Sequence, residues 1–475
     1  MSHVFDPGIL REYDIRGVVG RTLGVGDAYA VGRSFATMLR RLGGQRVAVG
    51  RDGRLSSPEL LAALVRGLRE SGADVVDIGL GPSPMLYYAE ASAEDIHGGV
   101  QVTGSHNPAD HNGFKIVMQG RAFFGEDIAQ LGRVSAAGDW TGGSGGIAYR
   151  DVLPAYVARL LEGLGGLDPA ALARLRIGWD AGNGATGPAL EMLAARLPGE
   201  HHLLFSKVDG HFPNHHPDPT VEANLADLRE LVATKQLHFG VAFDGDGDRI
   251  GVVDALGRIV WGDQLLAIYA EDLLREVPGA TIIADVKCSD TLFARIVELG
   301  GKPVMWKTGH SVLKSKMNET GALLAGEMSG HVFFGHRWYG FDDALYAAIR
   351  LIAASLRLGR TVTELRSAMP VLVNTPDIRF AVDEDRKFAL VDEIRDRLAA
   401  AGARVDTTDG VRVTDGDGWW LLRASNTQAM LTARAESASE PGLARLLDAI
   451  GAALEACGVP RPVELGGAAH AKRGA

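Results

Sequence analysis

The stretch RVAVGRDGRLSSPELLAALVRGLRESGADVVDIGL, residues 46–80, decides the fold class. Its apolar run at 46–50 ends in the turn RDGR, and residues 58–72 then have the apolar spacing of a helix that stops at a glycine. Residues 73–80 form a second strand-like run. Strand, polar loop, helix and strand in this order predict a parallel sheet covered by helices.

The same unit occurs twice more, at residues 176–197 and 281–306. We interpret the three units as three related α/β domains with mixed, mostly parallel sheets. The last hundred residues differ, because short strand-like runs follow one another beside helical stretches at 385–402 and 441–458, which indicates a C-terminal α+β domain. The predicted domains cover residues 1–150, 151–256, 257–370 and 371–465, followed by a disordered tail at 466–475.

The composition is that of a soluble globular protein with an excess of acid. Aspartate and glutamate number 59 against 49 lysines and arginines, which gives a formal charge of −10. This balance argues against a nucleic-acid or membrane binder, so positive charge for an anionic ligand must be local. Cys288 and Cys457 cannot form a disulfide framework, and Asp6 and Glu12 precede any apolar run that could form a signal peptide. We expect a cytoplasmic protein.

The motif TGSHNP, residues 103–108, follows the apolar run GGVQV. Ser105 should therefore lie in the loop after a strand, where open α/β sheets bind ligands, and the loop leads on to Lys115. An ordinary polar turn is the alternative, because Ser, Asn and Pro are common turn residues.

The motif DGDGD, residues 244–248, lies between two strand-like runs. Its three carboxylates converge on one small volume, and their repulsion calls for a cation such as Mg²⁺. An EF-hand is excluded, because its sixth and twelfth positions would be Arg249 and Ala255 instead of Gly and Glu. A solvated acidic turn is the alternative.

Two more polar loops follow strand-like runs. EMSGH, residues 327–331, gathers a carboxylate, a hydroxyl and an imidazole, a mixture that holds sugar hydroxyls. RASNTQ, residues 423–428, combines an arginine with hydroxyls and backbone N–H groups, which suits phosphate. Either loop can also be read as a simple turn. Basic groups that could supply local positive charge are Arg16, Arg51, Arg54, Lys115, Arg249, Lys287 and His310.

TGSHNP, DGDGDR, GEMSGH and RASNTQ occur in this order along the four predicted domains. This set resembles the α-D-phosphohexomutases, and GEMSGH is most similar to the bacterial phosphomannomutase/phosphoglucomutase group. The resemblance runs from EYDIRG near residue 12 to residue 428. It implies four domains around a central cleft, one loop from each: the phosphoserine, metal, sugar-recognition and phosphate-binding loops.

The resemblance also implies roles for individual residues. Ser105 would be a phosphoserine that donates and recovers the phosphoryl group, and its oxygen would complete the Mg²⁺ shell of Asp244, Asp246 and Asp248. The remaining catalytic positions would be Lys115 and His310 for proton transfer and reactive-site organisation, and Arg16 and Arg249 near the transferred phosphate. The substrate-binding positions would be Tyr13, His106, Lys287, Glu327, Ser329, His331, Arg423, Ser425, Asn426 and Thr427.

The implied reaction moves phosphate between the 1- and 6-positions of glucose and mannose phosphates, through a hexose 1,6-bisphosphate that also serves as activator. The implied partners are small-molecule hexose phosphates, and the implied state is a monomer or weak dimer. A phosphoglucosamine mutase is the nearest rival, against which Met328 argues by resemblance. A non-catalytic sugar-phosphate sensor would not need both the serine and the acidic triplet. A serine-dependent metal phosphohydrolase would need a further cluster of His and Asp, which the sequence does not display.

Overall fold

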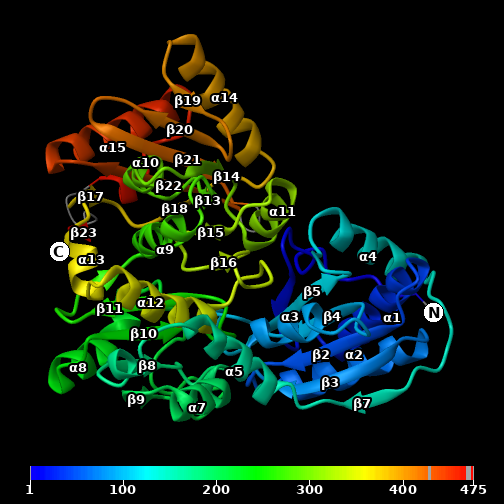
Figure 1. Ribbon diagram of the computed structural model, residues 1–475. Coiled ribbons are helices and arrows are strands. Elements are labelled where there is room, and N and C mark those ends of the chain that lie inside the picture. The colour runs from blue at the N-terminus through cyan, green and yellow to red at the C-terminus, as the bar shows by residue number, and fades with distance from the viewer. Residues whose placement is uncertain (1, 426–428, 467–471, 474–475) are drawn as a thin grey trace.

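The computed structural model describes residues 2–425, 429–466 and 472–473, which form four sheets with their helices (Figure 1). We call each sheet with its helices a domain. The prediction of three α/β domains with mixed sheets and a C-terminal α+β domain is confirmed.

The first domain has the sheet order β1-β5-β4-β2-β3-β7, with β6 beside β5. The central pairs β2–β4 and β2–β3 are parallel, whereas β5 runs antiparallel to β4 and β1. The strands are β1 (Ile15–Val18), β2 (Arg46–Arg51), β3 (Asp74–Leu80), β4 (Gly98–Val102), β5 (His111–Met118), β6 (Arg121–Ala122) and β7 (Ile147–Tyr149). The helices are α1 (Val25–Arg41), α2 (Ser57–Glu70), α3 (Ser83–Ala91) and α4 (Glu126–Ala137).

The second domain has the order β12-β11-β10-β8-β9, in which β8 pairs in parallel with β9 and β10. Its strands are β8 (Arg176–Asp180), β9 (Glu200–Leu204), β10 (Phe239–Phe243), β11 (Ile250–Asp254) and β12 (Ile259–Val260). Its helices are α5 (Leu153–Leu161), η1 (Glu162–Leu164), α6 (Pro169–Leu172), α7 (Gly187–Arg196), η2 (Glu222–Leu225) and α8 (Ala226–Lys235). The DGDGD motif is the tight turn of the antiparallel pair β10–β11, as predicted.

The third domain has the order β14-β13-β15-β16, with β13 parallel to β14 and β15. Its strands are β13 (Thr281–Asp285), β14 (Lys302–Trp306), β15 (Leu324–Gly326) and β16 (Val332–Phe334). Its helices are α9 (Gly262–Glu276), α10 (Asp290–Glu298), α11 (His310–Thr320), α12 (Ala344–Leu358) and α13 (Val362–Ser367). Helix α12 is almost wholly buried, because apolar residues lie on all its faces.

The fourth domain is an antiparallel sheet of order β19-β20-β21-β22-β17-β23, with β18 beside β22. Its strands are β17 (Val373–Asn374), β18 (Ile378–Ala381), β19 (Val405–Asp406), β20 (Val411–Thr414), β21 (Gly418–Ala424), β22 (Met430–Ser437) and β23 (Lys472–Arg473). Its helices are α14 (Lys387–Ala400), α15 (Glu440–Ala456) and η3 (Val463–Leu465). The pairing of β23 with β17 differs from the disordered tail expected at 466–475, most of which lies outside the described residues.

The apolar core is divided unequally. One continuous cluster of buried side chains extends through the first three domains, and a second fills the other face of the first sheet. The fourth domain has a core of its own and contacts the third through a small cluster of Val286, Trp419 and Leu421. Figure 1 shows the fourth domain, in orange and red, on top of the third. Within the described residues, no helix is both long enough and apolar enough to cross a membrane.

Candidate active site

The loop that carries Ser105 joins β4 to β5 and is held by a buried arginine. Ser105 has a φ of +50°, a left-handed conformation that is uncommon for a residue other than glycine, and only 1% of the residue is exposed. Arg54 donates Nη2 hydrogen bonds to the carbonyls of Ser105 at 2.7 Å and of Asn107 at 2.6 Å. The Ser105 N–H donates to Thr103 Oγ1 at 2.9 Å. The surrounding structure therefore compensates the strained backbone and fixes the hydroxyl.

The Ser105 hydroxyl meets the acidic turn of the second domain. Its Oγ donates to Asp244 Oδ2 at 3.0 Å and lies 3.1 Å from His106 Nδ1. The two loops touch closely, because a Cβ built on Gly245 would lie only 2.4 Å from the Ser105 carbonyl oxygen. Residues 139 positions apart in the chain thus form one site.

Asp244, Asp246 and Asp248 form a buried acidic cluster. None of the three residues is exposed, and one ligand atom from each lies within 4.8 Å of the others. Burial and then repulsion from the other two aspartates raise the pKa of Asp244 well above its usual value. Asp246 Oδ1 and Asp248 Oδ1 are buried without a hydrogen-bond partner among the described residues. Orphaned carboxylate oxygens on a crowded anionic turn fit a hard cation such as Mg²⁺.

Lys115 supplies positive charge to this cluster. Its Nζ lies 2.7 Å from Asp246 Oδ2 and also contacts Asp248 Oδ2. Burial favours the neutral amine, but the attraction of these two carboxylates outweighs it and raises the pKa of Lys115 well above its usual value. The same ammonium holds the pKa of Asp246 below its usual value against the opposing effect of burial. Lys115 is therefore a cation in this arrangement.

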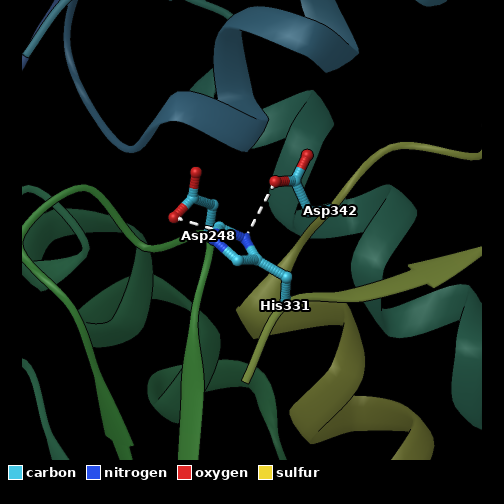
Figure 2. Close-up of side chains that lie close together, drawn as sticks. All are labelled: Asp248, His331 and Asp342. Carbon is cyan, nitrogen blue, oxygen red and sulfur yellow. Dashed lines mark ion pairs between the residues drawn. The ribbon is translucent and has the colours of Figure 1, made fainter. Parts of the chain in front are cut away.

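A His/Asp group that the sequence does not display adjoins the acidic cluster. In Figure 2, the ring of His331 lies between Asp248 and Asp342. Its Nδ1 is 3.0 Å from Asp342 Oδ2 and 3.8 Å from Asp248 Oδ1, while Arg249 Nε donates to its Nε2 at 3.0 Å. Because Nε2 accepts, the ring proton is on Nδ1 and faces both carboxylates. His331 Nδ1 and Asp342 Oδ2 lie within ion-pair distance, but neither atom has a hydrogen bond of good geometry among the described residues.

Asp342 links this histidine to two further basic groups. Lys314 Nζ lies 3.0 Å from Asp342 Oδ1, and His310 Nδ1 lies 3.8 Å from Oδ2. Burial alone would raise the pKa of Asp342, but Lys314 and His331 hold it well below its usual value. Burial and then the charge of Lys314 lower the pKa of His310 well below its usual value, and its ring stacks on His331 at 5.5 Å.

Asp342 and Lys314 are site residues that the sequence did not predict. The pair of aspartates before α12 gives one readable signal, a helix cap, and Asp343 does cap α12 by accepting the Tyr346 N–H at 2.9 Å. Nothing in the chain near Asp342 indicates a partner at His331 or Lys314.

The predicted sugar loop is tied to the start of α11. Glu327 accepts the Gly309 N–H on Oε1 at 2.6 Å and the Ser329 hydroxyl on Oε2 at 2.7 Å. Tyr13, from the first domain, donates to the Thr308 carbonyl at 2.9 Å. The first and third domains therefore meet at the loop that precedes His310.

The predicted phosphate loop lies in the fourth domain, and the aspartate that pairs with its arginine contacts the third. Arg423 Nε lies 3.0 Å from Asp409 Oδ2, and the same carboxylate oxygen accepts the Thr308 N–H at 3.0 Å. Lys287 Nζ is 3.1 Å from Asp377 Oδ2. The Ser425 N–H donates to the Met430 carbonyl at 3.0 Å. Asn426 and Thr427 lie outside the described residues.

Arg16 lies beside the serine loop, where its Nη1 donates to Asn107 Oδ1 at 2.8 Å. Burial, followed by the charges of Arg249, Arg16 and Lys115, lowers the pKa of His106 well below its usual value. The structure thus brings four kinds of group together where the first three domains meet. These are the hydroxyl of Ser105, the carboxylates of Asp244, Asp246 and Asp248, the imidazoles of His106 and His310 with their lowered pKa values, and the cations Lys115, Arg16 and Arg249. Such a set can hold and neutralise a phosphoryl group.

Comparison with known proteins agrees with this arrangement. Four family models match in order: "Phosphoglucomutase/phosphomannomutase, alpha/beta/alpha domain I" over residues 8–138, domain II over 154–257, domain III over 261–372 and the C-terminal domain over 378–453.

Relatives match over nearly the full length. The chain is 46% identical to a phosphomannomutase/phosphoglucomutase of Pseudomonas aeruginosa, covering 92% of this chain and 93% of that protein. It is 41% identical to a phosphoglucomutase of Neisseria gonorrhoeae, covering 94% and 96%. A crystal structure of a phosphoglucomutase/phosphomannomutase family protein from Burkholderia thailandensis superimposes with a TM-score of 0.89 at 43% identity, covering 96% of this chain and 98% of that one.

Proposed function

The chain belongs to the phosphoglucomutase/phosphomannomutase family, and on this premise we propose that it transfers phosphate between the 1- and 6-positions of glucose and mannose phosphates through Ser105. It is an isomerase of hexose phosphates, as are the relatives that match nearly its full length. The two sugars, the serine carrier and the residue roles below are the proposal.

The observation that carries the proposal is the contact of the Ser105 hydroxyl with Asp244 at the edge of the buried acidic cluster. Phosphoryl transfer needs an acceptor oxygen that is held in line with the leaving oxygen. It also needs positive groups beside the three equatorial oxygens, which neutralise their negative charge. The serine loop, fixed by Arg54, supplies the first, and Lys115 beside the cluster supplies part of the second.

Asp244, Asp246 and Asp248 would hold Mg²⁺, together with an oxygen of Ser105. The ion would neutralise charge on the phosphoryl oxygens when bound. Lys115 adds a fixed ammonium on the same side, so the ion and the ammonium together would balance the charge of the three carboxylates.

Arg16 and Arg249 would contact the transferred phosphate from two sides of the serine loop. His331 lies with Nδ1 beside Asp342 and accepts the Arg249 Nε–H on Nε2, so it would orient that guanidinium. His310 and His106 have pKa values below the usual range, which leaves neutral imidazoles at neutral pH. Either can accept the proton that the sugar hydroxyl loses as it takes the phosphoryl group.

Glu327 and Ser329 would form hydrogen bonds with the sugar hydroxyls. The fourth domain would bind the phosphate that is not being transferred. Arg423, Lys287, Ser425, Asn426 and Thr427 are the groups proposed for that phosphate. The first transfer gives a hexose 1,6-bisphosphate, which turns end for end, and its other phosphate then returns to Ser105. Free bisphosphate would therefore activate a dephosphorylated enzyme.

Mass spectrometry of the purified protein tests the carrier directly. A phosphoryl group should be found on the peptide with TGSHNP, and Ser105→Ala should lose nearly all turnover yet still bind glucose 1-phosphate. A phosphohydrolase would instead release inorganic phosphate and would not respond to glucose 1,6-bisphosphate, which would refute the mutase mechanism.

Parallel assays with mannose, glucose and glucosamine 1-phosphates test the sugar. A preference of several orders of magnitude for the glucosamine phosphate would replace the proposed substrates by those of a phosphoglucosamine mutase. Chelation should abolish turnover and Mg²⁺ should restore it, and full activity in excess chelator would remove the metal from the mechanism.

A further inference from the structure

A pocket of about 780 Å³ lies between the third and fourth domains, away from the serine loop. Its walls come from α9, α10, α13, the segment 367–374 and strand β22. Of the residues with proposed catalytic or binding roles none lines it, and Met328 is its single contribution from the sugar loop. The pocket is therefore a cavity that the proposed function does not use.

Arg434 on β22 is a buried cation in this wall. Only 3% of the residue is exposed, and its Nε and Nη2 have no hydrogen-bond partner within residues 2–425, 429–466 and 472–473. These two nitrogens form one edge of the guanidinium, the edge that binds a carboxylate with two parallel hydrogen bonds. A buried cation without such a partner is costly, so the site favours an anionic ligand.

The carboxylates nearby are already engaged. Glu436 accepts the Ser289 hydroxyl at 2.6 Å and the Trp419 indole N–H at 2.9 Å on one oxygen, Oε1. Asp263 accepts the Ser289 N–H on Oδ2 at 3.1 Å. Asp377, the third carboxylate near Arg434, pairs with Lys287 through Oδ2 at 3.1 Å, while its Oδ1 is buried without a hydrogen-bond partner among the described residues. None of the three forms an ion pair with Arg434 within the part of the chain that the structure describes.

Three other arginines of the pocket wall have acidic partners: Arg258 pairs with Asp254, and Arg360 and Arg295 both pair with Glu271. Arg366 donates from Nε to the Ile259 carbonyl at 3.0 Å. One guanidinium edge is thus left for a ligand, which suits a single negative charge better than a phosphate dianion. The rest of the wall is largely apolar, with Ile268, Leu292, Met328, Leu365, Met369 and Leu372.

We propose that this pocket binds a small organic monocarboxylate with an apolar body, held side-on by Arg434. Its occupant would touch both the third domain and the segment 367–374, which leads into the fourth. It would also lie behind the sugar loop, because α9 begins in close contact with that loop: a Cβ on Gly262 would be 2.4 Å from the Glu327 carbonyl oxygen. Occupancy therefore changes the affinity for hexose phosphate, and this second part rests on the proposed function.

Fluorine NMR with 6-fluoro-2-naphthoate tests the binding, and the uncharged 6-fluoro-2-naphthamide is the matched probe. The naphthoate should bind more tightly than the amide. Arg434→Met should weaken the naphthoate by about tenfold or more and leave the amide unchanged, because the side-on charged pair is lost. Arg379→Met, an exposed arginine on the neighbouring β18, should change neither.

A second variant tests the cavity from its opposite wall. Ala267→Trp on α9 should fill the pocket and remove binding of both probes, while thermal unfolding confirms that the variants fold. Equal naphthoate affinity in the wild type and Arg434→Met, unchanged binding in Ala267→Trp, or no binding to the wild type at millimolar concentration would each overturn the proposal.

Calorimetry with glucose 1-phosphate on Ser105→Ala tests the coupling. Saturating naphthoate should change the dissociation constant of the sugar phosphate by about fivefold or more. Saturating sugar phosphate should change the dissociation constant of naphthoate by the same factor. An unchanged constant would overturn the coupling. If no hexose phosphate binds at all, the proposed function fails, whereas the naphthoate titration still decides the pocket.

Discussion

Replacing Asp342 by asparagine removes one charge from the centre of the reactive site without changing its shape. The carboxylate holds Lys314 on one oxygen and His331 on the other, each at 3.0 Å. An asparagine has one acceptor and one donor end, so either Lys314 or the His331 Nδ1–H must face an NH₂ group. The loss of one charge-assisted hydrogen bond costs about 1.5–3 kcal/mol of unfolding free energy.

The same change should affect catalysis through the orientation of His331. With Nδ1 no longer held, the ring turns and Arg249 loses its acceptor at Nε2. We expect kcat to fall about ten- to a hundredfold, equivalent to about 1.4–2.7 kcal/mol, with KM nearly unchanged. Steady-state kinetics with glucose 1-phosphate and urea unfolding measure the two effects.

The neighbouring Asp343 provides a matched control. It is equally buried, burial raises its pKa to about 7, and it caps α12 and accepts the Tyr156 hydroxyl at 2.8 Å without touching the reactive site. Asp343→Asn should keep its kcat, because asparagine caps helices as well as aspartate. An equal fall of kcat in both variants, or a normal kcat in Asp342→Asn, would refute the positioning role.

Three further predictions concern other parts of the site and fold. Gly245→Ala places a methyl group only 2.4 Å from the Ser105 carbonyl oxygen, so activity should fall more than about a hundredfold while circular dichroism stays native. Wild-type turnover would contradict the close approach of the two loops. Arg423→Ala should raise KM about ten- to a hundredfold with a smaller change in kcat, and a collapse of kcat alone would assign this arginine to the transferred phosphate. His215 is partly buried, which lowers its pKa, but its contact with Asp180 at 2.9 Å outweighs this and raises the pKa overall. Its contribution to the free energy of unfolding is therefore complete below about pH 6.5, the unfolded pKa, and is lost as the pH rises through the higher folded pKa. In urea titrations, His215→Gln should lower the free energy of unfolding least at pH 9. An equal decrease at pH 5.5 and pH 9 would contradict this.

The sequence predicted those parts of the structure that short-range patterns encode. DGDGD between two apolar runs predicts a tight turn, and β10, the turn and β11 have that form, with the three aspartates buried in it. The cation at this turn stays a prediction. The strand–loop–helix unit at 46–80 likewise became β2, α2 and β3, because helical and strand spacing are local properties.

Partners that are far apart in the chain could not be predicted. Arg54 was one of several scattered basic groups, and its role in holding the Ser105 loop depends on backbone carbonyls, which leave no mark in a sequence. Asp342 meets Lys314 and His331 only when the third domain is folded. The pocket beside Arg434 arises from the way two domains pack, for which no local pattern exists.

The division of the apolar core predicts how the molecule comes apart. Because one cluster runs through the first three domains, these should lose their amide protection together in hydrogen exchange, as a single cooperative unit. The fourth domain has its own core, and its apolar contact with its neighbour is the small cluster of Val286, Trp419 and Leu421, so it should exchange at a lower free energy. A protease that cuts within 367–374 would then release a folded C-terminal fragment, and the remaining three domains would keep the serine loop and the acidic turn in register but lose the arginine at position 423.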